Sequence, residues 1–341
     1  MKRLLLCALA FGLLVPASAS AARQAWVSSN HIQVVDLDAG KVVGRIDLKE
    51  FIHDIEFAPD GNTAYIASSK GLRVADANAI RLDQHVSQAA SRGISVSADG
   101  HRVIVIHRAP KADALAARKA GLPLPPATLA VYTSKGMTLE SSFAVSGNAF
   151  DTAISADGSR IWILVPQDGV VLEHAPDGRL VDTIQLVDQV AAGPHAAMLS
   201  ELALSPSGDK LVVPVTNAED SYLAEIDLTG HRAERIINQG LGHARRIQGV
   251  RWDEDGSGVY VTAIQSMVKF DGRGLPVSWQ SFSANYVDVQ GLPGSDEAVV
   301  VTPTFNKANG TGAVGVLAAN GELLRTVELT DMSPFVVAVR P

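Results

Sequence analysis

The sequence predicts an all-β fold, a seven-bladed β-propeller whose ring is closed by the C-terminal strand. A strand, an Asp-Gly turn and a second strand recur from end to end, most plainly at residues 250–262. A second series of short turns recurs once per unit, and the last copy of the first strand stands alone at residues 335–341. Four-stranded units of roughly 40 to 50 residues are typical of propeller blades.

The first series of turns has the chemistry of a tight hairpin. Asp and Gly accept the positive-φ conformations of such a turn, and the flanking β-branched and aromatic residues suit buried strands. The turn glycines are Gly61, Gly100, Gly158, Gly208 and Gly256, and a degenerate sixth copy turns at Pro293-Gly294-Ser295.

The second series of turns falls between the third and fourth strands of each unit. These turns lie at residues 38–40, 77–79, 134–136, 176–178, 228–230, 271–273 and 319–321. Residues 25–46 contain three strands with no signature strand before them, whereas residues 335–341 form a first strand with nothing after it. We therefore expect the C-terminal strand to complete the N-terminal blade, which would remove exposed sheet edges.

The first 21 residues have the pattern of a secretory signal peptide. Lys2 and Arg3 precede an apolar run at residues 4–15 and small-residue cleavage sites at residues 17–21. The run is shorter than the about 20 residues of a membrane-spanning helix. We expect cleavage between residues 19 and 22, which leaves a periplasmic or secreted chain without Cys7, the single cysteine.

The charge of the chain limits its partners. Loss of Lys2 and Arg3 changes the formal net charge from −7 to −9. An acidic chain argues against nucleic acid or an anionic membrane as partner, and we expect no membrane insertion. Because the blades of a repeat fold pack only on their neighbours, residues 22–341 are expected to form one domain. This domain is expected to be monomeric by itself and to carry a rim insertion at 107–128.

A family resemblance emerges from the second strands of the units. Residues 64–67, 161–164 and above all 259–262, Val-Tyr-Val-Thr, resemble the YVTN-type repeats of bacterial extracytoplasmic seven-bladed propellers. The resemblance implies the fold. Such repeats are shared by binding proteins, lactonase-like enzymes and large subunits of quinone-cofactor amine dehydrogenases, so it transfers no catalytic residue to this chain.

Long loops are expected on one face of the ring only. They lie at residues 107–128, 185–200, 236–247 and 304–311, and the two series of short turns open on the opposite face. Residues 111–120 are good helix formers that end before Gly121. This short helix is either a packing cap or a lid or docking arm, because long loops on a rigid rim often carry binding groups.

Cationic side chains gather on the long-loop face. They are His31, His53, His85, His107, His195 and His243, with Arg92, Arg108, Lys111, Arg245 and Arg246. This favours an anionic ligand or an acidic partner surface. The alternative is that these side chains only solubilise the loops.

Alignment of the signature strands places ionisable residues at the mouth of the central channel. Asp54, Asp151 and Glu201 occupy equivalent positions, with His53 and Arg92 beside them. These groups could bind a hard cation, hydrogen-bond a polar ligand or act in acid–base chemistry, or they could simply form ion pairs in a solvated mouth. No His-x-His or Glu-x-x-His spacing occurs, so no metal site is predicted.

Several enzyme motifs are missing from the sequence. It contains no Gly-x-Ser-x-Gly elbow, no phosphate-binding loop and no haem-attachment Cys-x-x-Cys-His, and no cofactor is predicted. We interpret the chain as a non-catalytic periplasmic binding or scaffold protein for a small anionic molecule or a periplasmic protein partner. The alternative is a lactonase- or lyase-like enzyme, or a propeller subunit of a quinone-cofactor dehydrogenase. The predicted ligand-binding residues are His53, Asp54, Arg92, Asp151, Glu201, His243, Arg245 and Arg246.

Overall fold

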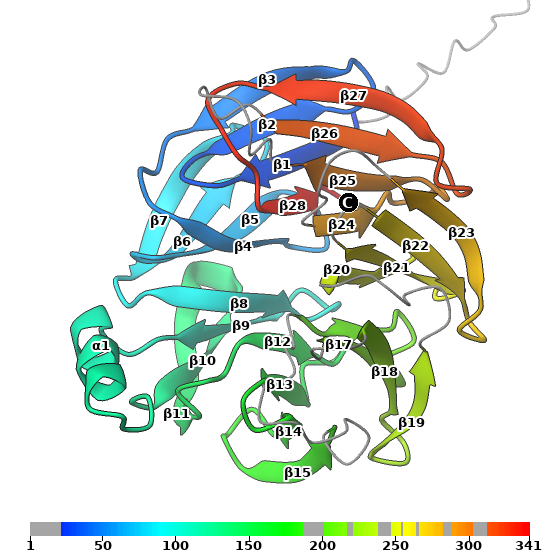
Figure 1. Ribbon diagram of the computed structural model, residues 1–341. Coiled ribbons are helices and arrows are strands. Elements are labelled where there is room, and N and C mark those ends of the chain that lie inside the picture. The colour runs from blue at the N-terminus through cyan, green and yellow to red at the C-terminus, as the bar shows by residue number, and fades with distance from the viewer. Residues whose placement is uncertain are drawn as a thin grey trace, which may run out of the picture.

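A computed structural model describes residues 22–186, 201–216, 221–237, 247–253, 255–263, 266–281, 288–302 and 312–341. Within these ranges, four-stranded antiparallel sheets follow one another around a central axis as the blades of a β-propeller (Figure 1). Seven such sheets are present, so the predicted fold class is confirmed. The predicted signal peptide, residues 1–21, lies outside the described residues.

Each blade runs from an inner strand to an outer strand. Blade I contains β28 (Val336–Val339), β1 (Gln24–Ser28), β2 (Ile32–Asp36) and β3 (Lys41–Ile46). Blade II contains β4 (Ile52–Phe57), β5 (Thr63–Ser68), β6 (Gly71–Asp76) and β7 (Arg81–Ser87). Blade III contains β8 (Ser91–Val96), β9 (Arg102–His107), β10 (Ala127–Thr133) and β11 (Thr138–Val145).

The remaining four blades repeat this order. Blade IV contains β12 (Asp151–Ile154), β13 (Ile161–Val165), β14 (Val170–His174) and β15 (Leu180–Gln185). Blade V contains β16 (Ala203–Leu204), β17 (Lys210–Thr216), β18 (Ser221–Asp227) and β19 (Arg232–Ile237). Blade VI contains β20 (Ile247–Trp252), β21 (Gly258–Ala263), β22 (Ser266–Asp271) and β23 (Pro276–Ser281). Blade VII contains β24 (Asp288–Gly291), β25 (Ala298–Thr302), β26 (Gly312–Leu317) and β27 (Leu323–Leu329).

The hydrophobic core lies between blades. Each cluster of buried apolar side chains in the described residues draws its members from two consecutive blades. Between blades I and II, for example, Trp26 packs edge-on against Phe57 with ring centroids 5.3 Å apart. Because a twisted sheet buries both faces against its neighbours, the middle strands are apolar on both faces, as Ile161–Val165 shows.

The ring is closed by the C-terminal strand, as predicted. β28 pairs antiparallel with β1 in a register that joins Val339 to Ala25. Arg340, just beyond β28, donates to the carbonyl of Gly61 in blade II at 2.7 Å. Arg23, just before β1, pairs with Glu297 of blade VII at 2.5 Å. Polar contacts to both neighbouring blades therefore reinforce the closing sheet.

The insertion in blade III contains the helix. α1 (Lys111–Lys119) follows Pro110 and lies outside the ring, at the edge of the disc in Figure 1. None of its residues is buried, so it does not serve as a packing cap through its own side chains. A short 3-10 turn, η1 (Lys135–Met137), connects β10 to β11. In the described residues, no helix has the length and apolar character needed to cross a membrane.

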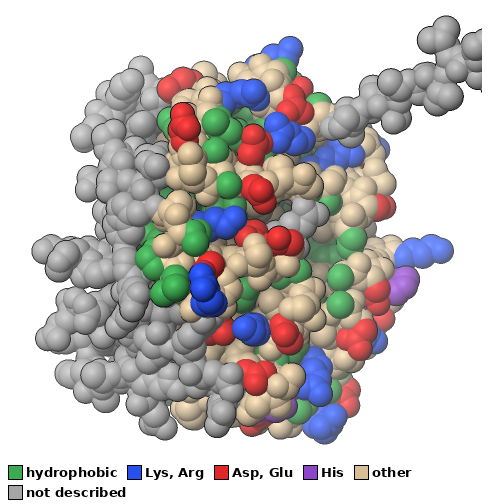
Figure 2. All heavy atoms as spheres, turned by 90° about the vertical axis from the view of Figure 1, so that its right-hand side faces the viewer, with side chains coloured by type: hydrophobic (Ala, Val, Ile, Leu, Met, Phe, Trp, Pro, Cys, Tyr) green, Lys and Arg blue, Asp and Glu red, His purple; other side chains and the backbone are tan. Residues whose placement is uncertain are grey.

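One side of the outer wall of the ring carries mixed charge. On the side shown in Figure 2, Lys and Arg side chains are interspersed with Asp and Glu. Such a surface favours solubility and offers no single-sign field to a charged partner. The ionisable residues of interest lie around the axis instead.

Candidate functional site

The channel is built from the inner strands by a simple sequence rule. The residue seven positions before each turn glycine starts the first layer of channel side chains: Asp54, Gly93, Asp151, Glu201 and Gly249. Because alternate residues of a strand point the same way, the residues two positions later form a second layer: Glu56, Ser95, Ala153, Ala203 and Arg251. Blade VII adds Asp288 and Gln290. We call Asp54, Glu56, Asp151, Glu201 and Asp288 the channel carboxyls.

Four channel carboxyls join one blade to the next. Asp54 Oδ2 accepts the backbone N–H of Ile94 in blade III at 2.8 Å, and its Oδ1 accepts the N–H of Ile55 at 2.8 Å. Asp151 and Asp288 repeat this arrangement, and Glu201 accepts one N–H of blade VI. Their inter-blade donors are Leu202 at 2.9 Å, Val337 at 2.9 Å and Val250 at 3.1 Å. These predicted site residues therefore have a structural role.

Glycine occupies the first layer in blades III and VI, beside Asp151 and Asp288 of the following blades. A Cβ at Gly93 would lie 3.1 Å from the Cα of Asp151, and one at Gly249 would lie 3.3 Å from the Cα of Asp288. Both distances are tighter than ordinary van der Waals contact. The glycines therefore leave room for the aspartates of the following blades to pack against these strands.

Arg251 is the counter-charge of the channel. Its Nη1 donates to Glu201 Oε2 at 3.1 Å and to the carbonyl of Val250 at 2.9 Å. Burial by itself would lower the pKa of Arg251, but the charges of Glu201 and Asp288 outweigh it and raise the pKa above its usual value. Burial likewise raises the pKa of Glu201, against the opposing effect of Arg251.

Burial, together with an excess of acids over cations, raises the pKa values of the channel carboxyls. Burial, and then the charge of Asp54, raises the pKa of Glu56 to about 8. Burial is also the main cause that raises the pKa values of Asp151 and Asp288 to about 6. Among the described residues of the second layer, Arg251 is the only one that carries a guanidinium, and it faces five channel carboxyls. The interior of the channel is therefore acidic.

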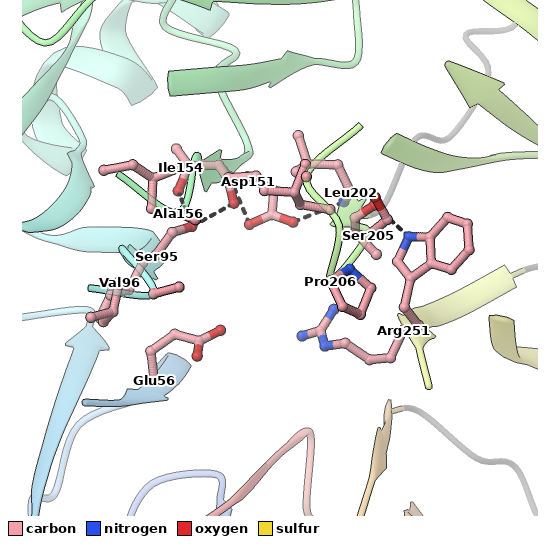
Figure 3. A pocket seen from close by; sticks show the side chains of 18 of the residues that line it. Glu56, Ser95, Val96, Asp151, Ile154, Ala156, Leu202, Ser205, Pro206 and Arg251 are labelled. Carbon is pink, nitrogen blue, oxygen red and sulfur yellow. Dashed lines mark hydrogen bonds between the residues drawn. The ribbon is translucent and has the colours of Figure 1, made fainter. Parts of the chain in front are cut away.

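A cavity of about 460 Å³ extends from the channel carboxyls toward the face of the short turns. Its inner end is lined by Asp54, Glu56, Asp151 and Arg251, and its outer end by the exposed Ala98, Ala156 and Pro206. Figure 3 shows Glu56 and Arg251 projecting toward each other from opposite sides of this space. The sequence pointed only to the long-loop face, but the cavity reaches the short-turn face.

The other end of the channel is aromatic and cationic. The Arg92 guanidinium carbon lies 3.3 Å from the ring centroid of Phe150. Phe51 packs edge-on against His53 with centroids 5.0 Å apart, and lies 5.6 Å from the Phe335 ring. We call this group, with Arg108, the channel mouth.

The electrostatics of the channel mouth are those of crowded cations. Burial, and then Arg108, lowers the pKa of Arg92 to about 10. Burial, and then Arg92 and Arg108, lowers the pKa of His53 to about 4, so the imidazole is neutral near pH 7. Within the part of the chain that the structure describes, neither Arg92 nor Arg108 forms an ion pair with a carboxylate.

The structure brings five of the eight predicted site residues to the channel. His53 and Arg92 lie at the mouth, and Asp54, Asp151 and Glu201 lie in the first layer. The other three, His243, Arg245 and Arg246, lie outside the described residues. Two histidines that were predicted on the long-loop face, His31 and His107, are buried instead.

Sequence reasoning missed Glu56, Arg251 and Asp288. Glu56 and Arg251 could have been predicted from the sequence, because each lies two residues after an aligned first-layer position. Asp288 was harder to find. The degenerate turn of blade VII has its glycine at Gly294, so counting back seven residues leads to Val287 instead.

In the described residues, no group of His, Asp and Glu side chains is arranged as metal ligands would be.

Comparison with known proteins supports the fold alone. No family model and no curated protein sequence matches the chain. A functionally unknown protein from Desulfotomaculum acetoxidans superposes with a TM-score of 0.72 at 12% identity, over 93% of this chain and 99% of that one. The resemblance to YVTN-type repeats therefore stays a prediction.

Two further solved structures have the same kind of likeness. The dihydro-heme d1 dehydrogenase NirN, in complex with DHE, gives a TM-score of 0.59 at 14% identity, over 93% of this chain and 75% of that one. The β-propeller domain of Cps50 (Swd1) from Myceliophteria thermophila gives 0.63 at 11% identity, over 83% and 88%. At such identities no activity carries over to this chain.

Proposed function

We propose that this propeller is a binding protein that takes a small anionic molecule at the channel mouth. The observation that carries the proposal is the pair Arg92 and Arg108, two partly buried guanidiniums that form no ion pair with a carboxylate in the described residues, although the charges of Asp151 and Asp54 act on Arg92. Each guanidinium attracts a negatively charged ligand and so lowers the free energy of its bound state. A buried or half-buried cation left without hydrogen-bond acceptors is costly, and a bound carboxylate or phosphate would supply them.

The aromatic side chains of the mouth define the rest of the ligand. Phe51 and Phe335 are exposed by 42% and 39%, so they present apolar surface beside the cationic pair. Phe150 holds the Arg92 guanidinium in place by stacking. His53 is neutral at pH 7 and can donate or accept one hydrogen bond without adding charge. These features favour a carboxylate attached to an aromatic or apolar body.

The test is calorimetric titration of the full chain with benzoate and 1-naphthoate. Replacing Arg92 and Arg108 together by Ala should weaken binding at least tenfold, about 1.4 kcal/mol. Raising the salt concentration should weaken binding to the unmodified protein, because exposed charges are screened. The control replaces Lys41 and Arg179, which are exposed on the short-turn side. Equal losses from both double variants would refute the proposal.

A catalytic alternative rests on Glu56. In the described part of the chain its carboxyl has no hydrogen bond, whereas Asp54, Asp151 and Asp288 accept backbone N–H groups with both oxygens. A carboxyl with a pKa of about 8 can act as a general acid near neutral pH. The alternative predicts that the protein opens lactones or esters and that Glu56→Gln abolishes this turnover, whereas Arg92→Ala changes it less.

We also propose that the protein works outside the cytoplasm. The support is the charge and hydropathy pattern of residues 1–21 and the absence of cysteine from the rest of the chain. Cell fractionation followed by N-terminal sequencing tests this proposal. Recovery of the protein in the cytoplasm with Met1 retained would contradict it.

A further inference from the structure

We propose that the channel cavity is a second ligand site, which takes a small organic cation and uses Glu56 as its counter-charge. The proposal is independent of the anion site at the mouth. It rests on the shape of the cavity, on the side chain that faces it without a partner, and on the charge of the groups around it.

The cavity has the size and lining of a small-molecule site. Its volume of about 460 Å³ lies within the range of about 300–1,000 Å³ typical of ligand pockets. Its walls are largely apolar, with Ile94, Ile154, Leu202 and Trp252 among them. The indole Nε1 of Trp252 already donates to the carbonyl of Ala203 at 3.0 Å. The apolar walls therefore fit a hydrocarbon or aromatic body with one polar end.

Glu56 is the polar group that such a ligand would meet. Its carboxyl has no hydrogen-bond partner in the described residues, and Figure 3 shows it directed into the cavity. Arg251 faces it from β20, but no ion pair joins the two, because Arg251 is bonded to Glu201 and to the carbonyl of Val250. Glu56 is therefore left without an ion pair in the described residues, although the charge of Arg251 acts on it.

The surrounding charges favour a cation over an anion. The groups that face Glu56 are Asp54 on its own strand, Asp151 on β12, Asp288 on β24 and Arg251 on β20. Three of these four groups are acids, and Glu201 adds another acid beside Arg251. An ammonium or guanidinium group would reduce the repulsion among these carboxyls, whereas a bound carboxylate would increase it.

Proton release gives this site a distinctive signature. The pKa of Glu56 is raised to about 8, so near pH 7 the empty site holds a proton that a bound ammonium would displace. An alkylammonium keeps its own charge over this range, as lysine does. Affinity should therefore rise with pH up to about 8 and fall by up to about tenfold for each unit below it.

The experiment is calorimetric titration of the full chain with phenethylamine at pH 6 and pH 8, in two buffers of different ionisation enthalpy. We expect binding at pH 8 that weakens by at least tenfold at pH 6, with proton release visible as a buffer-dependent heat. Glu56→Gln should weaken binding at least tenfold and remove the buffer dependence. Glu322→Gln, at an exposed turn of blade VII, is the matched control.

A second variant keeps the test decisive if Glu56→Gln does not fold. Ala156→Trp fills the exposed end of the cavity and leaves every charge in place, so it should also weaken phenethylamine binding. The Arg92 and Arg108 double variant should retain phenethylamine binding, which separates this site from the mouth. The proposal is overturned if phenethylamine does not bind the unmodified protein, or if both cavity variants bind it unchanged.

Discussion

Asp288 on β24 accepts the backbone N–H of Val337 on β28 at 2.9 Å, and this bond joins the last blade to the strand that closes the ring. The same carboxylate accepts the N–H of Val289 at 2.8 Å. One side chain thus fixes the start of an inner strand and the position of its neighbour. Asp54 and Asp151 do the same in other blades.

Asp288→Asn should destabilise the protein by about 1–3 kcal/mol, because the amide keeps only one acceptor oxygen and leaves one of the two buried N–H groups unpaired. Urea unfolding followed by circular dichroism measures the change. The control is Asp83→Asn, whose carboxylate is 40% exposed and pairs with Arg81 on the surface. A loss no larger than that of the control would show that the inter-blade bond adds little.

Deletion of residues 332–341 should abolish cooperative unfolding, because it removes β28 entirely and exposes the apolar cluster shared by blades VII and I. Differential scanning calorimetry of the truncated chain measures this. Deletion of Pro341 alone, an exposed residue, should leave the melting temperature close to that of the full chain. A truncated chain that melts at the original temperature would mean that blade I is stable with three strands.

Replacement of residues 111–122 by a short Gly-Ser linker should leave the propeller folded, because α1 buries no side chain and loop length costs little closure entropy. Thermal melting measures the effect. Extending the replacement through Leu124 and Pro125 should cost more, since these residues lie so close to Gly147 that a Cβ there would be 2.8 Å from Leu124 Cβ. If the replacement of residues 111–122 unfolded the protein, α1 would be needed for stability and the prediction would be wrong.

Glu56 should make the protein less stable as the pH rises from about 4.5 to about 8. Its pKa is raised from the usual 4.5 to about 8 in the folded chain, so its stabilising contribution is complete below pH 4.5 and has been lost once the pH has passed 8. The slope for one proton is at most about 1.4 kcal/mol per pH unit. His53, with a lowered pKa of about 4, acts in the opposite direction but only below about pH 6.5.

Urea unfolding at several pH values measures this slope. Glu56→Gln should flatten it, and Glu322→Gln should leave it unchanged because that side chain is exposed. Parallel curves for the unmodified protein and Glu56→Gln would show that the Glu56 carboxyl titrates alike in the folded and unfolded chains.

The sequence by itself determined the blades, their number and the closure of the ring. These features depend on local chemistry: a turn glycine needs positive φ, as Gly61 and Gly158 show, and a strand that is buried on both faces is apolar throughout. Residues 335–341 are a first strand with nothing after it, so the sequence predicted that this strand completes the N-terminal blade, and β28 does pair with β1 there. Asp54, Asp151 and Glu201 could be aligned because each stands at a constant distance from a turn glycine.

Only the tertiary structure decided what those carboxyls do and which groups remain free. Hydrogen bonds such as Asp54 to Ile94 join residues 40 positions apart, and no local pattern encodes them. The raised pKa of Glu56 depends first on its burial and then on the charges of Asp54, Asp151 and Asp288 around the axis. Electrostatic energy varies with distance and burial rather than with sequence spacing, so the acidic cavity could be recognised only once the ring was closed.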